Sequence, residues 1–287
     1  MVLSRLKQFF GGGSRVNVKE RFDIKSKSGM GSMSKVFRAF DKQLKKTVCL
    51  KLLDKEKTAQ FEARFVGLKK PSEGEISGAL HHANVVETFE HGLTTTGEPY
   101  LVQEWIAAHG LHAMVDAVHP NLEGNRIRIL AQAAEALEYM HQQKYIHRDV
   151  CPRNLLVSDA LHVKLIDFGL TIPYKPEFCK PGNRTGTPQY LAPEVIKRMA
   201  TDHRVDLFAL GVTAYETFTR ELPWGNFESV QVQMSAFQNP GADPREHVPD
   251  MDEATAQFLM KAIDRDMAKR FPTAAAFREA LQKLPRR

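Results

Sequence analysis

Cysteine and long apolar stretches are scarce in this 287-residue sequence. The three cysteines, Cys49, Cys151 and Cys179, form no C-x-x-C pair, and their odd number argues against a disulfide framework and against a zinc site. No apolar stretch reaches the roughly 18 residues that a membrane-spanning helix needs, and the N-terminus lacks the apolar core of a signal peptide. We therefore expect a chain without a transmembrane segment, in a reducing, cytoplasmic compartment.

The charge balance is mildly basic, with a net charge of +6. Such a balance is compatible with nucleic acid, anionic lipid or acidic partners, and equally with a surface that only keeps the protein soluble. Because the basic residues are scattered and form no stripe with aromatic residues, we expect no nucleic-acid binding.

The pattern of apolar residues changes along the chain from strand-like to helical. Predicted strands lie at 22–24, 36–40, 47–52, 85–90 and 100–106, with helical signals near 61–68 and from Ser72 onward. Beyond residue 110 we predict helices at 126–143, 205–218, 230–237, 255–263 and 274–281, and short strands at 155–157 and 163–166. This order predicts an α+β fold with a small β-rich lobe followed by a larger helical lobe.

Residues 1–20 precede this pattern and are interpreted as an N-terminal leader. Leu3, Leu6, Phe9 and Phe10 have helical spacing, and three glycines follow. Such a segment can lie on a membrane surface, but we favour a short amphipathic leader that docks on its own domain.

Two features of the β-rich part are weak signals of phosphate binding. Gly29 and Gly31 lie between the first two predicted strands, where glycines let backbone N–H groups approach phosphate oxygens; a plain hairpin turn explains them equally well. Lys51 lies at the end of the strand-like run that begins at Val48. A strand lysine neutralises phosphate charge when a carboxylate holds it in place, although most strand lysines face solvent.

A stronger signal lies further along the chain. The tripeptide His-Arg-Asp at residues 147–149 precedes Asn154, and Asp-Phe-Gly follows at residues 167–169. Phosphoryl transfer needs a carboxylate that orients the attacking hydroxyl, and oxygen ligands that hold magnesium on the phosphates. Asp149 suits the first task, and Asn154 and Asp167 suit the second.

With these motifs in this order, the sequence resembles the protein kinase superfamily over about residues 21–284. Residues 186–194, Gly-Thr-Pro-Gln-Tyr-Leu-Ala-Pro-Glu, resemble the end of an activation segment, and residues 206–211 resemble the helix that anchors the catalytic loop. Arg270 resembles the late arginine that pairs with the last glutamate of that segment, here Glu194. The resemblance implies a two-lobed kinase fold, with residues 21–106 as the N-lobe and 107–287 as the C-lobe.

The resemblance also implies cofactors and residue roles. ATP and Mg²⁺ are the expected cofactors, with Asn154 and Asp167 as metal ligands. The expected catalytic residues are Asp149 as the base, with Lys51, Arg153 and Thr187. The residues expected around the nucleotide are Ser28, Gly29, Gly31, Ser34, Val36, Cys49, Lys51, Glu73, Leu156, the gatekeeper Gln103, and Glu104 and Ile106, which offer backbone groups to adenine.

The sequence leaves two candidates for the carboxylate partner of Lys51. Comparison with the family places it at Glu73, and Glu75 is the alternative. Because successive helical residues are about 100° apart, these two carboxylates lie about 200° apart and only one faces the cleft. The neighbouring Gly74 and Gly78 weaken the helix by up to ~1 kcal/mol each relative to alanine, which suits a helix that swings.

Three positions depart from the family pattern. Ser34 replaces the third glycine of the phosphate loop, and Cys151 stands where serine/threonine kinases usually have a lysine. Arg153 resembles the catalytic loop of receptor-type tyrosine kinases. Because its guanidinium is always charged and pairs well with phosphate oxygens, we expect Arg153 to replace the missing lysine; a salt bridge to the surrounding loop is the alternative. Gly-Thr-Pro at 186–188 is the serine/threonine form of the substrate loop, so we predict an active serine/threonine kinase that acts on proteins.

Two other functions remain open. A pseudokinase that serves as a binding module would explain Cys151, Ser34 and the uncertain glutamate. The four residues whose loss usually abolishes activity in the family are all present, however: Lys51, Asp149, Asn154 and Asp167. A small-molecule phosphotransferase of the aminoglycoside or choline type shares the nucleotide-binding lobe. Such enzymes generally lack the Ala-Pro-Glu segment and its arginine partner.

Two hypotheses concern regulation. The activation segment is expected to be phosphorylated on Thr171 or Thr185, with Arg148 pairing with the phosphate, although the usual phosphosite position holds Asn183. Cys151 lies beside arginines that would lower its pKa and make the enzyme sensitive to oxidants. The alternative is that Cys151 is a small residue that fills a tight loop.

Overall fold

The computed structural model describes residues 15–30, 33–182, 184–227 and 229–285. Residues 1–14 of the expected leader, Gly31 and Asn183 lie outside the described residues. The chain divides into two compact units, the first made of the residues up to Ala79 together with Glu87–Ile106, and the second of Leu80–Val86 together with Ala107–Arg287. None of the helices in the described part is long and apolar enough to cross a membrane.

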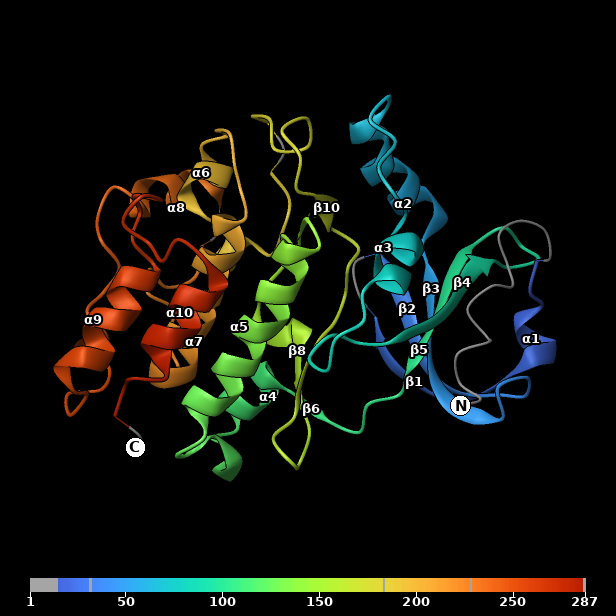
Figure 1. The fold of residues 1–287 in the computed structure, drawn as a ribbon, viewed down its shortest axis with the longest axis horizontal. Helices are drawn as coiled ribbons and strands as arrows, with labels where there is room; N and C mark the ends of the chain where they lie inside the picture. Colours follow the sequence, from blue (N-terminus) through green and yellow to red (C-terminus); the bar gives the residue numbers. More distant parts are fainter. Residues whose placement is uncertain (1–14, 31–32, 183, 228, 286–287) are drawn as a thin grey trace. The chain divides into compact units, whose positions relative to one another are not determined.

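The first unit is built on one antiparallel sheet of five strands (Figure 1). The order β1-β2-β3-β5-β4 is formed by β1 (Phe22–Met30), β2 (Ser34–Asp41), β3 (Lys46–Leu53), β4 (Thr88–Leu93) and β5 (Pro99–Glu104). The helical elements are α1 (Val18–Arg21), α2 (Lys55–Glu62), the 3-10 turn η1 (Ala63–Phe65) and α3 (Glu73–Ala79). The helix predicted near 61–68 lies earlier, because Asp54 caps its start by accepting hydrogen bonds from two backbone N–H groups.

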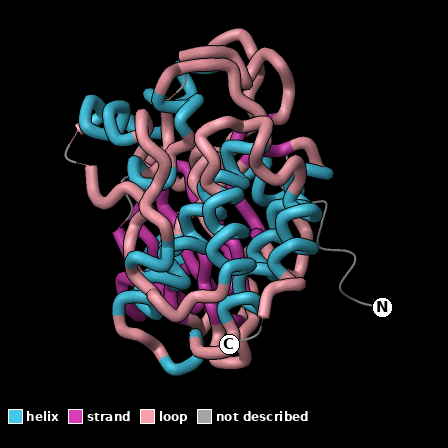
Figure 2. Tube along the Cα trace, turned by 90° about the vertical axis from the view of Figure 1, so that its left-hand side faces the viewer, coloured by secondary structure: helices cyan, strands magenta, loops and turns pink. Residues whose placement is uncertain are grey.

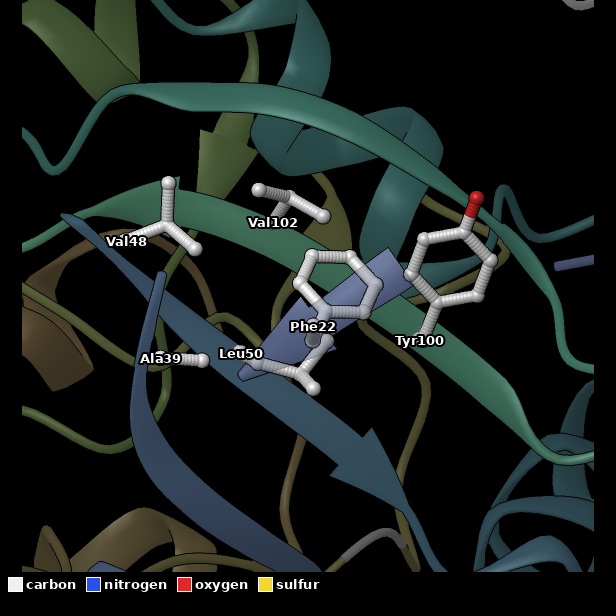
Figure 3. Close-up of a cluster of buried hydrophobic side chains, with 6 residues drawn as sticks. All are labelled: Phe22, Ala39, Val48, Leu50, Tyr100 and Val102. Carbon is white, nitrogen blue, oxygen red and sulfur yellow. The ribbon is translucent and has the colours of Figure 1, made fainter. Parts of the chain in front are cut away.

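The register of the sheet gives it two chemically different faces. Val36 and Leu101 both lie opposite Lys51, and Gln103 lies opposite Cys49, so these five side chains share one face. Alternate residues form the hydrophobic core on the other face, where each is at most 3% exposed. Figure 3 shows this cluster: Phe22, Ala39, Val48, Leu50, Tyr100 and Val102.

The chain that precedes β1 also belongs to this unit. Val16 forms a parallel bridge with Thr94, through two backbone hydrogen bonds of 3.0 and 2.9 Å. Val16 and Val18 pack against the core cluster. Residues 15–20, which the sequence assigns to a leader, are therefore an integral part of the first unit.

A charged network ties the start of β1 to the rest of the sheet. The guanidinium of Arg21 donates to both oxygens of Asp41 and of Glu90, at 2.6–3.1 Å, and the hydroxyl of Tyr100 donates to Glu90. The Asp41 side chain is fully buried. A buried carboxylate is stable only when paired, so this network depends on all of its members.

Helix α3 begins at a capping box and packs closely on β4. Both the backbone N–H and the hydroxyl of Ser72 donate to Glu75 at 2.8 Å, and the Glu75 N–H donates back to the Ser72 hydroxyl at 3.3 Å. A Cβ atom on Gly74 would lie only 2.5–2.7 Å from Cβ, Cγ and Nδ1 of His91. Gly74 therefore allows the close approach of α3 to β4, a role that the sequence did not reveal.

The second unit is mainly helical; Figure 2 draws all helices of the chain in cyan. Its helices are α4 (Leu111–Asp116), α5 (Arg126–Gln142), α6 (Pro193–Ile196), α7 (Arg204–Thr219), α8 (Val230–Ala236), α9 (Glu253–Ala262) and α10 (Ala274–Leu281). Its short strands are β6 (His109–Gly110), β7 (Tyr145–Ile146), β8 (Leu155–Val157), β9 (Val163–Leu165) and β10 (Ile172–Pro173). The 3-10 turns are η2 (Pro120–Leu122), η3 (Pro152–Asn154), η4 (Pro188–Tyr190) and η5 (Pro244–Glu246). Helix α7 is largely buried and contacts α5 and α9, while α10 packs on α5.

Residues 80–86, which the sequence assigns to the N-lobe, belong to the second unit. The Val86 N–H donates to the Leu165 carbonyl at 3.0 Å, and the Leu165 N–H donates to the Asn84 carbonyl at 2.8 Å. The side-chain amide of Asn84 also donates to the Val163 carbonyl. These bonds to β9 explain why the strand predicted at 85–90 begins only at Thr88.

Candidate active site

A buried ion pair holds Lys51 in the first unit. Its Nζ lies 2.6 Å from Oε1 of Glu73, and each side chain is 7% exposed. The competing candidate, Glu75, is exposed, and its hydrogen bonds to Ser72 lower the pKa of its carboxyl. Glu73 is therefore the partner of Lys51, as the sequence favoured. Loss of either partner would leave a buried charge without its counterion.

The other residues expected around the nucleotide in this unit lie along β1, β2, β3 and β5. Gln103 is buried, and its amide donates to Thr88 at 3.0 Å, which fixes the gatekeeper side chain. Burial raises the pKa of the Cys49 thiol to about 11, despite the opposing charge of Lys51. The sheet face that carries Cys49 and Lys51 thus combines apolar and cationic character, which suits a base next to phosphates.

The expected phosphate loop and hinge lie at the ends of these strands. Ser28 and Gly29 are in β1, where Gly29 lies opposite Val36, and Ser34 begins β2. In the hinge, the Glu104 N–H donates to the Glu87 carbonyl at 2.9 Å, and Ile106 follows β5. The contacts of these residues with a nucleotide stay predictions.

In the second unit, Asp206 of α7 anchors the expected catalytic loop at its first residues, His147 and Arg148. Its carboxylate accepts hydrogen bonds from the backbone N–H groups of His147 and Arg148, at 2.9 and 2.8 Å, and from His141 of α5 at 2.9 Å. Complete burial alone would raise the pKa of the Asp206 carboxyl, but these partners lower it on balance. Asp206 therefore stays ionised and holds Arg148 in the left-handed region, at a φ of 68°.

The carboxylate of Asp149 meets the substrate loop. Oδ1 of Asp149 accepts hydrogen bonds from the hydroxyl and the backbone N–H of Thr187, at 2.8 and 2.9 Å. The amide nitrogen of Asn154 donates to the carbonyl and to Oδ2 of Asp149, at 2.8 and 3.1 Å. Three hydrogen bonds thus fix the orientation of the Asp149 carboxylate, and a fourth holds its backbone carbonyl, as a base that positions a hydroxyl requires.

Gly186 allows this approach of the substrate loop. Its φ is +132°, and a Cβ atom there would lie 2.8 Å from the carbonyl oxygen of Arg148. Any side chain would therefore push Thr187 away from Asp149.

The two expected metal ligands supply oxygen atoms of the kind that Mg²⁺ prefers. The nitrogen of the Asn154 amide is engaged by Asp149, so its oxygen is the atom left to accept or to coordinate. Asp167 has a φ of 66°, a conformation that recurs at functional sites. No cluster of three or more His, Cys, Asp or Glu side chains suited to a metal occurs among the described residues. One carboxylate plus one amide fits magnesium, which usually completes its shell with water and phosphate oxygens.

Cys151 has the opposite electrostatic character to the one predicted. The thiol is 2% exposed. Burial, together with the neighbouring charge of Asp149, raises its pKa to about 12. Burial and the raised pKa therefore oppose the hypothesis of a reactive thiolate and favour the alternative, in which Cys151 is a small residue that fills the loop.

Arg153 and Leu156 lie in the second unit on either side of Asn154, the expected metal ligand. The Arg153 side chain is exposed on η3. Burial raises the pKa of Glu216 above its usual value, and the charge of Arg153 opposes this rise. The hydroxyl of Tyr190 donates to Glu216 at 2.5 Å. Leu156 is half-buried in β8. The roles of Arg153 in transfer and of Leu156 against adenine stay predictions.

Glu194 and Arg270 form the ion pair that the resemblance implies. Two parallel hydrogen bonds of 2.8 Å join the guanidinium to the carboxylate, and Arg270 is 3% exposed. The guanidinium also lies over the ring of Phe208, 4.6 Å from its centroid. This pair fixes the end of the activation segment to the helical core.

The two expected phosphorylation sites differ in accessibility. Thr171 is fully buried and its hydroxyl donates to the His147 carbonyl, so a kinase cannot reach it in this conformation. Thr185 is partly exposed and stays a candidate.

Sequence reasoning missed two contacts that support the site. His141 donates to Asp206 across 65 positions, and the buried amide of Gln233 in α8 donates to the Pro188 carbonyl at 2.6 Å. Neither histidine nor glutamine at these positions forms a local motif. No pattern in the sequence alone would have found them.

Comparison with known proteins agrees with the geometry. A family model described as protein kinase domain matches residues 22–283. The serine/threonine-protein kinase pkn3 of Myxococcus xanthus is 29% identical over 279 residues, which cover 91% of this chain and 49% of the relative. The serine/threonine-protein kinase PknB of Mycolicibacterium smegmatis is 31% identical over 281 residues, covering 92% and 43%. PknB of Mycobacterium tuberculosis is 29% identical over 277 residues, also covering 92% and 43%. The chain thus spans less than half the length of these relatives.

Proposed function

This chain belongs to the protein kinase family, and we propose that it transfers the γ-phosphoryl group of ATP, with magnesium, to serine and threonine hydroxyls of proteins. The observation that carries the proposal is the arrangement around Asp149. Its carboxylate is held by Asn154 and Thr187 in the way that a base for an incoming hydroxyl requires.

Within this proposal, each unit contributes a separate part of the chemistry. Asp149 orients the acceptor hydroxyl and takes up its proton as the oxygen attacks phosphorus. Lys51, kept in place by Glu73, would bind the α- and β-phosphates, and Asn154 with Asp167 would hold magnesium. Bound Mg-ATP supplies the phosphoryl group and the metal charge that stabilises its transfer.

Two features support serine and threonine as acceptors, and one departs from that pattern. Gly-Thr-Pro at 186–188 has the serine/threonine form, and its Thr187 binds the base directly. The relatives named above are serine/threonine kinases. Arg153 is the one residue that resembles the tyrosine-specific loop, and its exposed side chain leaves the Asp149–Thr187 contact untouched.

The alternative functions lose part of their basis. The pseudokinase interpretation relied on an uncertain glutamate, and Glu73 pairs with Lys51 at 2.6 Å. The small-molecule phosphotransferase interpretation is opposed by the bidentate pair between Glu194 and Arg270. The second of these pairs is the feature expected of a protein kinase with a structured activation segment.

The direct test is to incubate the purified chain with Mg-ATP and a mixture of basic proteins, and to map the phosphorylated residues by mass spectrometry. We expect phosphoserine and phosphothreonine. Asp149→Asn should lower kcat by about 10²–10⁴-fold, because it removes the base. Lys51→Met should lower it comparably, because it removes a charge on the phosphates.

A matched control is Asp159→Asn, which changes an acidic side chain that is 89% exposed in the same unit. It should keep the wild-type rate. Asp149→Asn and Asp159→Asn should unfold at wild-type urea concentrations, whereas Lys51→Met should unfold at a lower one, because it leaves Glu73 buried without its counterion. If Asp149→Asn keeps more than about a tenth of the wild-type rate, the assigned base is wrong.

A further inference from the structure

The second unit carries a groove that the proposed chemistry does not use. It has a volume of about 690 Å³ and lies between the end of α6, helix α8 and the turn that follows α9. Helices α6 and α8 lie side by side (Figure 1). The groove is lined by Lys197, Gln231, Met234, Ser235, Phe237, Gln238 and Arg265.

The inner part of the groove is apolar and firmly held. Phe237 is 3% exposed and packs edge-on against Trp224 and Phe208. The outer part is open, since Met234 of α8 is 45% exposed. The groove thus offers the apolar side chain of a partner two apolar contacts, the buried Phe237 and the exposed Met234.

The charged side chains that line the groove have one sign. Its lining includes the cations Lys197 and Arg265 and no carboxylate. Arg265 donates through Nη1 to the carbonyls of Phe237 and Gln238, so its guanidinium is fixed at the end of α8. The carboxylates of Asp264 and Asp266 accept backbone N–H groups of their own turn. The complementary partner therefore presents a carboxylate next to an apolar side chain.

Helix α8 is linked to the catalytic loop. Gln233 is 1% exposed, and its amide donates to the Pro188 carbonyl at 2.6 Å. Pro188 follows Thr187, whose hydroxyl donates to Asp149. A polypeptide held on the exposed side of α8 is thereby connected, through one buried side chain, to the loop that receives the acceptor hydroxyl.

We propose that this α8 groove, defined by Lys197, Met234, Phe237 and Arg265, docks a segment of the protein substrate that carries acidic side chains beside apolar ones. The apolar side chain covers Met234 and Phe237, and the carboxylate pairs with Lys197 and Arg265. The proposal rests on the proposed function, because it assigns the occupant to the substrate. Docking raises the concentration of the acceptor at Asp149 without any new contact there.

The test uses two synthetic substrates with the same acceptor sequence, taken from the phosphosite mapping. One is the acceptor alone, and the other carries a flexible Gly/Ser linker and the segment Asp-Glu-Phe-Asp-Leu-Glu. We expect kcat/KM to be at least about tenfold higher for the fused substrate, because an effective concentration near 1 mM exceeds a docking Kd of about 100 μM. A fused segment with every acid replaced by lysine should give a ratio near one.

The variants are Lys197→Glu and Met234→Asp, each of which should bring the ratio of fused to unfused kcat/KM close to one. Their matched controls are Lys283→Glu, an exposed lysine of the same unit, and Val118→Asp, a 55% exposed apolar residue. Both controls should keep the wild-type ratio. The ratio is internal to each variant, so a general change in activity does not mimic the result.

Binding is measured separately by fluorescence anisotropy of the labelled Asp-Glu-Phe-Asp-Leu-Glu peptide. If the wild type phosphorylates no acceptor but binds this peptide through Lys197 and Met234, the proposed function fails and the groove stands. The groove proposal is overturned if the wild-type ratio is near one, if the lysine-substituted segment works equally well, or if both variants keep the ratio. It is also overturned if Met234→Asp only dissociates a dimer in sedimentation, since the occupant is then a second copy.

Discussion

Replacement of Gly74 by alanine tests why helix α3 carries glycines beside Glu73. If the glycines only made the helix flexible, alanine would stabilise it by up to ~1 kcal/mol. The structure predicts the opposite sign for Gly74, because its position lies against His91. A Cβ atom there would lie 2.5 Å from Cγ and 2.6 Å from Cβ of His91.

The magnitude follows from which atoms collide. Cβ and Cγ lie at the base of the His91 side chain, so a rotamer change does not move them out of the way. Overpacking of this kind costs about 1–3 kcal/mol, and the gain in helix propensity offsets up to ~1 kcal/mol of it. We expect Gly74→Ala to lower the free energy of unfolding by about 1–2 kcal/mol. Displacement of α3 should also separate Glu73 from Lys51 and lower kcat/KM.

Gly78 is the matched control on the same helix. A Cβ atom there would lie 3.5 Å from the nearest atom of His91, an ordinary contact. Gly78→Ala should therefore stabilise the protein by up to ~1 kcal/mol. In a His91→Gly background, which removes both Cβ and Cγ of His91, the collision is gone, and Gly74→Ala should become stabilising as well. The reversal of sign makes the double-mutant cycle decisive.

The assay is urea unfolding followed by tryptophan fluorescence. The sequence has two tryptophans, of which Trp105 lies in the first unit and Trp224 in the second. In a Trp224→Phe background, fluorescence reports only the first unit. A stabilising effect of Gly74→Ala in the presence of His91 would refute the packing argument and restore flexibility as the reason for the glycine.

The other predictions concern the second unit. Arg270→Leu should lower the free energy of unfolding by about 3–5 kcal/mol in a urea titration, because it leaves Glu194 buried without a partner. Its control, Arg278→Leu, breaks part-exposed pairs and should lower the free energy of unfolding by about 1 kcal/mol or less. Native Cys151 should resist iodoacetamide at pH 8, because a pKa of about 12 leaves the thiol neutral; loss of activity that Cys151→Ser prevents would contradict this. Arg153→Ala should lower kcat by about 10²–10³-fold with little change in the KM for ATP, and adding Cys151→Lys to this variant should restore part of the lost rate. If the activation free energy rises by less than ~1 kcal/mol in Arg153→Ala, the proposed role of Arg153 is rejected.

Much of the site was readable from the sequence because its parts are local. Asp149 and Asn154 are five residues apart in the sequence, and a hydrogen bond of 3.1 Å joins their side chains. Ser72 marks the start of α3 because a cap depends only on its neighbouring residues. The alternation of β3 placed Lys51 on the face opposite the apolar core. Short-range stereochemistry is encoded position by position, so it needs no knowledge of the rest of the chain.

Only the tertiary structure decided the features that depend on partners distant in sequence. It chose Glu73 over Glu75, gave Gly74 its role against His91, and raised the pKa of a thiol that its charged neighbours in sequence had suggested would be lowered. Burial and electrostatics are properties of the surroundings, and the surroundings of Cys151 are set by how α7 and the substrate loop pack on the catalytic loop. The sequence therefore determined which chemistry is available, and packing decided which side chains are placed to perform it.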